Sequence, residues 1–202
     1  MKRMNIIICP GIHGTELTDS FVNQVKKSIS DNYSSTIKAE NIVIFPSQNY
    51  PAYSAFHILQ FLEDSGIKPL EGNNLPVPLL FISFSAGVVG ALGAAWTWQA
   101  FRGKVKGFIA LDGWGVPLTG DFPIHRMSHD HFTHWSSALL GSGEDSFYAD
   151  PPVGHLELWR SPLTTSGWWV NSEYGKPQVR SPMNAAQFLT MLLERYAELE
   201  EG

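Results

Sequence analysis

The stretch FISFSAGVVGALGAA, residues 81–95, changes character at Ser85. Apart from Ser83, the residues before Ser85 are apolar or aromatic, as in a strand that is buried on both faces. The residues after it are small or apolar and are typical of a buried helix. Ser83 and Gly87 flank the serine with small side chains, which leave room for a sharp turn between strand and helix. The stretch therefore predicts a strand followed directly by a helix, with Ser85 at the junction.

The first half of the chain alternates between strand and helix patterns. Short apolar runs that predict buried strands lie at Ile6–Cys9, Ile42–Phe45, Leu79–Ile82 and Phe108–Leu111. Apolar residues at helical spacing lie between them, from Leu17 to Ile29, from Ala55 to Leu62 and from Val88 to Ala95. This order predicts an α/β fold: a doubly wound, mainly parallel sheet of about four to six strands with helices on both faces. Functional groups of such sheets gather at the carboxyl ends of the strands.

The composition is that of one folded domain, which we expect over residues 1–202. The chain is 44% hydrophobic and 16% charged, which argues against disorder. A net charge of −5 without clustered basic residues disfavours nucleic acid as a partner. No apolar run approaches the roughly 18 residues of an integral membrane segment. The apolar run near the start of the sequence is too short for a secretory signal, and the sequence has a single cysteine, Cys9. Both features suggest a cytoplasmic location. Nothing in the sequence indicates an oligomeric state.

The second half of the chain has a different composition. Residues 113–182 are rich in Gly, Pro, Ser, His and Trp, and they offer one helix candidate, around Ser128–Leu140. We expect a loop-rich, lid-like region over the carboxyl ends of the strands. Apolar residues at helical spacing from Ala185 to Leu199 then predict a closing amphipathic helix.

Ser85 is the candidate nucleophile. The segment SFSAG, residues 83–87, differs from the Gly-x-Ser-x-Gly pattern of a nucleophile elbow only by a serine in place of the first glycine. The following helix would present its amino end to a negative charge that develops near the serine. The alternative is that Ser85 marks a purely structural junction between strand and helix.

The segment CPGIHGTE, residues 9–16, follows the first predicted strand. Acyl transfer at a serine requires two backbone N–H donors that face the oxyanion. We expect these donors to be the amides of Ala86 and Ile12, with His13 as an orienting or wall residue. A phosphate-binding loop is disfavoured because neither glycine-rich phosphate motif occurs here.

On these two motifs the chain resembles the α/β-hydrolase superfamily, in a compact form that lacks the usual first strands. The resemblance spans about residues 4–160. It implies a serine nucleophile on the elbow, an oxyanion loop after an early strand, and triad residues in the chain order serine, acid, histidine. The acid of the family usually follows one strand later than the strand that precedes Asp112.

Asp112, at the end of the strand after the elbow, is the preferred acid. Its alternative role is to cap an Asp-Gly turn, and the competing acids are Asp150, Asp145 and Asp130. His155, in the loop ADPPVGH, is the preferred base. The order of the triad excludes His13 and His57 and leaves, as competing bases, His134, His131, His129 and His125.

The segment HDHFTH, residues 129–134, raises the alternative of a metal site built from His129, Asp130, His131 and His134. We expect a helical part of the lid instead, and neither a metal nor a cofactor. Aromatic residues of the second half can line an apolar pocket or form a satellite core. They are Trp114, Phe132, Trp135, Phe147, Tyr148, Trp159, Trp168 and Trp169. We assign Trp114 to substrate binding.

The sequence thus predicts a serine hydrolase that cleaves esters through Ser85, His155 and Asp112, with a small apolar acyl or aromatic ester as substrate. A thioesterase or acyltransferase with the same site is an alternative. A non-catalytic binding protein that retains the fold is another, and so is a metal-dependent hydrolase.

Overall fold

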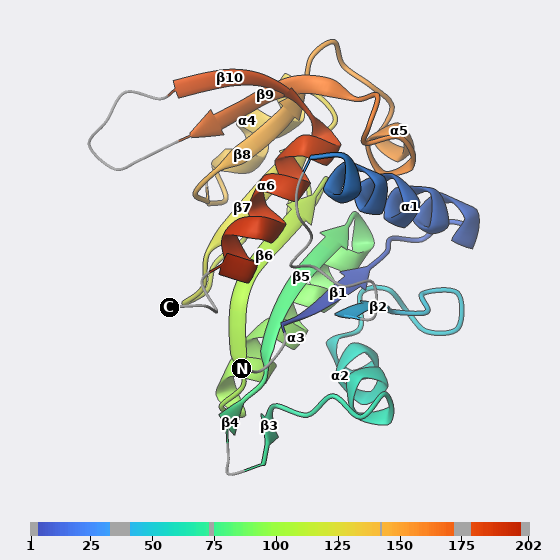
Figure 1. The fold of residues 1–202 in the computed structure, drawn as a ribbon, viewed down its shortest axis with the longest axis vertical. Helices are drawn as coiled ribbons and strands as arrows, with labels where there is room; N and C mark the ends of the chain where they lie inside the picture. The colour runs from blue at the N-terminus through green and yellow to red at the C-terminus, as the bar shows by residue number, and fades with distance from the viewer. Residues whose placement is uncertain (1–3, 33–40, 73–74, 142, 172–178, 199–202) are drawn as a thin grey trace.

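An eight-stranded sheet forms the framework of the structure, a computed structural model that describes residues 4–32, 41–72, 75–141, 143–171 and 179–198 (Figure 1). The strand order is β10-β9-β8-β7-β6-β5-β1-β2. The strands are β1 (Asn5–Cys9), β2 (Ile42–Ile44), β5 (Pro78–Phe84), β6 (Lys104–Leu111), β7 (Ile124–Ser128), β8 (Ser146–Ala149), β9 (Ser166–Asn171) and β10 (Val179–Asn184). Neighbouring strands from β2 to β8 are parallel, and β9 and β10 continue the sheet antiparallel. The fold is α/β with a mostly parallel, mixed sheet.

Helices cover both faces of the sheet. They are α1 (Thr15–Asn32), α2 (Ala55–Asp64), α3 (Ala86–Ala100), α4 (His131–Ala138), α5 (His155–Arg160) and α6 (Ala185–Glu198). Side chains of α1 and α6 pack with Leu80 and Ile109 in one core, and side chains of α2 and α3 pack with Leu79 and Phe108 in the other. Alternate residues of a strand point to opposite faces, so both faces of β5 and β6 are apolar. Figure 1 shows α6 in front of the sheet. A short hairpin of β3 (Leu70–Glu71) and β4 (Leu75–Pro76) stands apart from the sheet.

Most of the elements expected in the first half of the chain are present. The four predicted apolar runs correspond to β1, β2, β5 and β6, and the helical patterns between them correspond to α1, α2 and α3. All seven residues of β5 are buried, as an interior strand of a sheet covered on both faces requires. The predicted α/β class, the mainly parallel sheet and the helices on both faces are confirmed.

The expected sheet of four to six strands is wrong, and so is the expected loop-rich second half. Residues 113–182 include α4, α5 and the strands β7, β8 and β9, and β10 begins at Val179. These strands lack a clear apolar pattern. In β7 the buried side chains of His125 and Arg126 are polar, and each is satisfied by hydrogen bonds to backbone carbonyl oxygens. A strand that contains polar residues of this kind has no continuous apolar run, so the sequence pattern does not predict it. The helix candidate around Ser128–Leu140 corresponds to α4.

None of the helices in the described ranges combines the length and the apolar composition needed to cross a bilayer.

Candidate active site

Ser85 occupies a strained turn between β5 and α3. Its backbone angles are φ 53° and ψ −123°, in a region that residues with a side chain rarely adopt. The Ser85 N–H donates to the carbonyl oxygen of Leu111 at 3.0 Å, which ties the turn to the end of β6. The hydroxyl makes no capping bond to α3. The turn therefore leaves the hydroxyl available for other partners.

Small residues around the turn are required by close backbone contacts. A Cβ at Gly87 would lie 2.4 Å from the carbonyl oxygen of Cys9, and one at Gly90 would lie 2.4 Å from that of Ala52. Ser83 takes the place of the first glycine of the elbow pattern. Its buried hydroxyl donates to the carbonyl oxygen of Ile109 at 3.2 Å. A serine fits there because β6 satisfies its hydroxyl.

The loop after β1 runs beside the elbow. A Cβ at Gly11 would lie 3.0 Å from the Cβ of Ser85. The Ser47 hydroxyl donates to the carbonyl oxygen of Gly11 at 3.1 Å. In a trans peptide the N–H points away from the C=O, so this bond turns the Ile12 amide away from Ser47. Ala86, whose amide is the other expected donor, lines the same cavity as Ser85.

His13 belongs to this loop, and its ring packs against aromatic side chains. The ring lies 5.7 Å from that of Phe84 and 6.2 Å from that of Trp159, between ring centroids. Its Nδ1 lies 2.9 Å from the carbonyl oxygen of Gly14, which fits a donating Nδ1–H. These contacts fix the orientation of the His13 ring.

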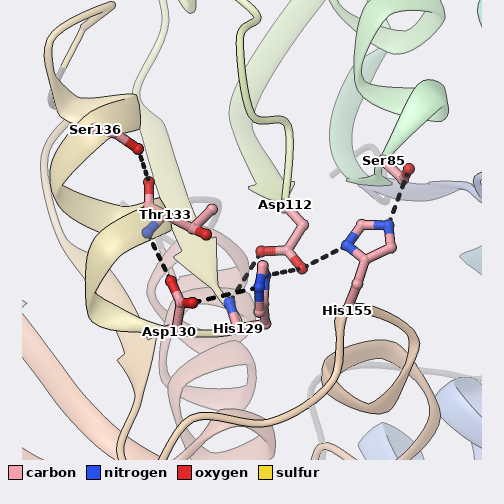
Figure 2. A network of polar contacts seen from close by, with 7 residues as sticks. All are labelled: Ser85, Asp112, His129, Asp130, Thr133, Ser136 and His155. Carbon is pink, nitrogen blue, oxygen red and sulfur yellow. Dashed lines mark hydrogen bonds and ion pairs between the residues drawn. The ribbon is translucent and has the colours of Figure 1, made fainter.

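Asp112 follows β6 and is the centre of a hydrogen-bond network (Figure 2). Its Oδ2 lies 2.8 Å from His155 Nδ1 and 2.9 Å from His129 Nδ1, and its Oδ1 accepts the His129 backbone N–H at 2.9 Å. The carboxylate is fully buried. Burial opposes ionisation, but the hydrogen bonds from His129 and His155 outweigh it and hold the pKa of Asp112 below its ordinary value. Asp112 is therefore an anion at neutral pH.

His155, the first residue of α5, connects Asp112 to Ser85. Its Nε2 lies 3.1 Å from Ser85 Oγ. Because Nδ1 faces a carboxylate, it carries the proton, and Nε2 is left to accept the serine hydroxyl. Figure 2 shows His155 between Asp112 and Ser85, with a dashed contact to each; Asp112 follows β6, Ser85 follows β5, and His155 begins α5. The structure thus brings together the three residues that the sequence analysis selected.

The competing acids have other partners. Asp145 pairs with Arg195 and accepts the Trp169 indole N–H at 2.8 Å. Asp150 accepts the Trp168 indole N–H at 2.9 Å. Asp130 is the N-cap of α4 and accepts the Thr133 N–H. None of these bonds leads to Ser85.

Of the competing histidines, only His129 reaches Asp112 among the described residues. His125 is buried, with Nδ1 3.1 Å from the Asp145 carbonyl oxygen and Nε2 2.6 Å from the Tyr196 hydroxyl. His131 and His134 lie against the ring of Tyr148, at centroid distances of 4.9 and 5.1 Å. His57 belongs to α2 and contacts Ser54.

The sequence offers His129 as a competing base but does not predict its place beside Asp112. It directly follows β7, at the same edge of the sheet as Asp112. Its hydrogen bond to Asp112 raises its pKa above the ordinary value, against the effect of burial, and the charges of Asp112 and Asp130 add to the rise. A strand recognised at 124–128 would have placed His129 at this edge.

A stack of aromatic rings supports His155 from below. The ring of Phe84 lies 4.7 Å from the imidazole of His155 at an interplanar angle of 24°. Trp159 stacks on Phe84 at 5.0 Å, and Phe21 stacks on Trp159 at 3.7 Å. Phe84, Trp159 and Phe21 are fully buried. The stack fixes the plane of the imidazole, and its π face favours a positive charge on that ring.

A cavity of about 470 Å³ opens above Ser85. Its lining residues are Ser85, Ala86, Val89, Asp112, Trp114, Val116, His129, Thr133 and His155. Trp114 is 66% exposed, and its indole N–H donates to Ser136 Oγ on α4 at 3.1 Å. Of the eight aromatic residues considered in the sequence analysis, Trp114 is the one in the lining. Phe147, Tyr148 and Trp159 are buried.

The residues of the alternative metal site do not converge. His131 and His134 face Tyr148, whereas Asp112, His129 and His155 bring one ligand atom each within 4.8 Å of one another. Both imidazoles already bond to Asp112 through Nδ1. A metal there would have to replace these bonds and detach His155 from Asp112. We therefore interpret Asp112, His129 and His155 as hydrogen-bond partners of one another rather than as metal ligands.

No protein-family model matches the chain, and no curated protein matches its sequence significantly.

Proposed function

We propose that the chain is a serine hydrolase that cleaves esters through an acyl-enzyme intermediate. One observation carries the proposal: a continuous chain of hydrogen bonds from Ser85 Oγ through His155 to Asp112, which starts at a strained turn and borders a cavity. A nucleophile, a base and an orienting acid within hydrogen-bond reach form the arrangement that serine hydrolases require.

In the first step, Ser85 Oγ attacks the carbonyl carbon of the ester while His155 Nε2 accepts the hydroxyl proton. The oxyanion that forms accepts hydrogen bonds from the amides of Ala86 and Ile12. The amino end of α3 adds a favourable field. His155 then donates its proton to the leaving alcohol oxygen as the C–O bond breaks, which leaves the acyl group on Ser85.

In the second step, water replaces the alcohol. His155 Nε2 accepts a proton from water, whose oxygen attacks the acyl carbon. The resulting intermediate expels Ser85 Oγ, which takes the proton back from His155, and the carboxylic acid leaves. Asp112 holds the tautomer of His155 and stabilises its positive charge in both steps, and the ring of Phe84 supports the same charge.

The cavity supports an uncharged substrate. Val89, Val116 and Trp114 give it apolar walls, and its lining, as far as the structure describes it, contains no lysine or arginine. An anionic substrate would lose its hydration there without a matching cation. We infer that the substrate is a small-molecule ester with an apolar acyl group or an aromatic group.

We further propose that the chain is a compact member of the α/β-hydrolase superfamily. The proposed nucleophile, acid and base follow β5, β6 and β8 in that order, which agrees with the chain order of the superfamily. The acid lies one strand earlier than is usual there, and the end of β7 carries His129 instead. The buried thiol of Cys9, whose pKa burial raises, is compatible with the cytoplasmic location that we also propose.

A fluorophosphonate probe tests the proposed function without the natural substrate. The probe is expected to form a covalent bond with Ser85, which peptide mapping would locate, and the folded Ser85→Ala variant is expected to stay unlabelled. Labelling should require the native fold, so urea-unfolded protein is the second control. A folded wild-type protein that resists the probe would favour a non-catalytic binding protein.

A further inference from the structure

The Asp112 carboxylate serves two imidazoles at once. Its Oδ2 faces Nδ1 of His155 and Nδ1 of His129 at 2.8 and 2.9 Å, and the backbone N–H of His129 occupies its Oδ1. His129 therefore supplies two of the three hydrogen bonds that the described residues donate to this buried carboxylate. The two histidines share one negative charge.

His129 also faces a second carboxylate. Its Nε2 lies 3.5 Å from Oδ2 of Asp130, which is the N-cap of α4 and accepts the backbone N–H of Thr133. Among the described residues, the titratable groups around His129 are Asp112 after β6, Asp130 before α4 and His155 at the start of α5. A proton on His129 would thus lie between two anions. The hydrogen bond to Asp112 and these charges raise the pKa of His129.

We propose that His129 is a positioning residue of the active site, which holds the Asp112 carboxylate and, when its ring is protonated, competes with His155 for that negative charge. The inference rests on the proposed function. The rings of the two histidines lie 5.9 Å apart and nearly perpendicular, so a charge on His129 disfavours a second charge on His155. A charge on His129 also partly neutralises the negative charge of Asp112, so Asp112 then stabilises the His155 imidazolium less well.

This arrangement predicts two steps in the loss of activity as the pH falls. Protonation of His129 lowers kcat/KM only in part, because the proposed base can still accept the serine proton. Protonation of the base itself abolishes turnover. Without the His129 ring, the first of these two steps is absent.

The His129→Asn variant separates this role from a merely structural one. Its amide N–H can replace the Nδ1–H bond to Asp112, and the backbone N–H is kept. At pH 9 we expect kcat/KM within about tenfold of the wild type, because the hydrogen bonds remain. The pH profile of the variant should have one step, whereas that of the wild type has two.

A profile of His129→Asn that parallels the wild type at every pH would overturn the proposal, since a structural defect scales the rate without moving the pH dependence. His129→Ala, which removes the ring bond, should lower the plateau further and keep the single step. Thermal unfolding of both variants checks that they are folded.

Histidine NMR titration of the Ser85→Ala variant provides a readout without turnover. The ring signals of His129 are expected to titrate above the pH range of an ordinary histidine, with assignments from His129→Asn. A titration of His129 in or below the ordinary range would contradict the proposal even in an active enzyme. If the chain hydrolyses no ester but His129 titrates above that range, the proposed function fails and the sharing of Asp112 stands.

Discussion

Two aspartate–histidine groups lie at opposite edges of the parallel sheet. At the carboxyl edge, Asp112 bonds to His155 and His129 through its carboxylate, beside an open cavity. At the amino edge, the ring nitrogens of His125 contact the backbone carbonyl oxygen of Asp145 and the hydroxyl of Tyr196 on α6, and the residue is fully buried. Similar residues are thus placed in different environments.

The two environments shift the histidines in opposite directions. The Asp112 carboxylate raises the pKa of His129, whereas burial lowers the pKa of His125 to about 4, although Asp145 opposes the change. The Asp145 carboxylate is already paired with Arg195. An aspartate beside a histidine supports proton transfer only where its carboxylate contacts the ring and the other ring nitrogen faces a substrate cavity.

Removal of the hydroxyl partner of each histidine should give the largest contrast. Ser85→Ala removes the proposed nucleophile, and we expect kcat to fall about 10⁶-fold with little change in thermal unfolding. Tyr196→Phe leaves Nε2 of buried His125 without a partner, so it should cost about 1–3 kcal/mol of unfolding free energy and spare kcat. Ester assays and urea unfolding of both variants measure the contrast. Equal activity losses would contradict it.

Neutralisation of each aspartate is expected to give the next largest effect. Asp112→Asn should reduce kcat about 10⁴-fold, because the amide cannot hold the reactive tautomer of His155 or stabilise its charge. Asp145→Asn breaks the pair with Arg195 far from the cavity, and kcat should stay within about threefold of the wild type. Steady-state kinetics at pH 8 test both. A similar loss of kcat in Asp145→Asn would remove the distinction between the two edges.

The stability of the amino-edge group should depend on pH in a defined window. His125 is neutral when folded down to its pKa of about 4, whereas in the unfolded chain it takes up a proton near 6.5. Its stabilising contribution is therefore present above pH 6.5 and is lost as the pH falls from 6.5 towards 4.

Urea unfolding of wild type and His125→Asn at pH 7 and pH 5 measures this loss. The unfolding free energy of the wild type should fall by roughly 2 kcal/mol more than that of the variant. The raised pKa of His129 acts with the opposite sign: its contribution is present below pH 6.5 and is lost as the pH rises through the folded value. His129→Asn should therefore make the loss towards low pH steeper.

The smallest effect is expected from the aromatic stack. Phe84→Leu removes the ring beneath His155, and we expect kcat to fall about tenfold because a cation–π contact of the imidazolium is lost. Phe81→Leu is the matched control, since Phe81 is equally buried in β5 but packs in the core of α2 and α3. Both variants should lose stability, and only Phe84→Leu should lose rate. Equal rates would show that the stack is only structural.

The sequence was most informative where its signals are local. Ser85 is marked by its small neighbours, Asp112 by the end of an apolar strand, and His155 by its place after the acid. Each of these features needs only a few adjacent residues. Both faces of β5 and β6 are buried, so these strands contain apolar runs that the sequence pattern predicts.

Features that depend on distant partners could not be predicted. Strands β7 to β10 are stabilised by pairing rather than by apolar runs, and Arg126 in β7 is buried because carbonyl oxygens near the end of α4 accept its hydrogen bonds. The role of His129 depends on the pairing of β7 with β6. The stack of Phe84 on Trp159 joins residues of β5 and α5. Such contacts are set by tertiary structure.

The separation of the site residues along the chain has a consequence for refolding. Ser85 and Asp112 meet His155 across 70 and 43 positions, and the last strands of the sheet lie between or beyond them. Contacts of this length form late, because closure of long loops is entropically costly. Partly assembled chains would therefore lack the proposed triad, and recovery of the proposed activity would report the placement of α5 beside the ends of β5 and β6 rather than the first appearance of helices.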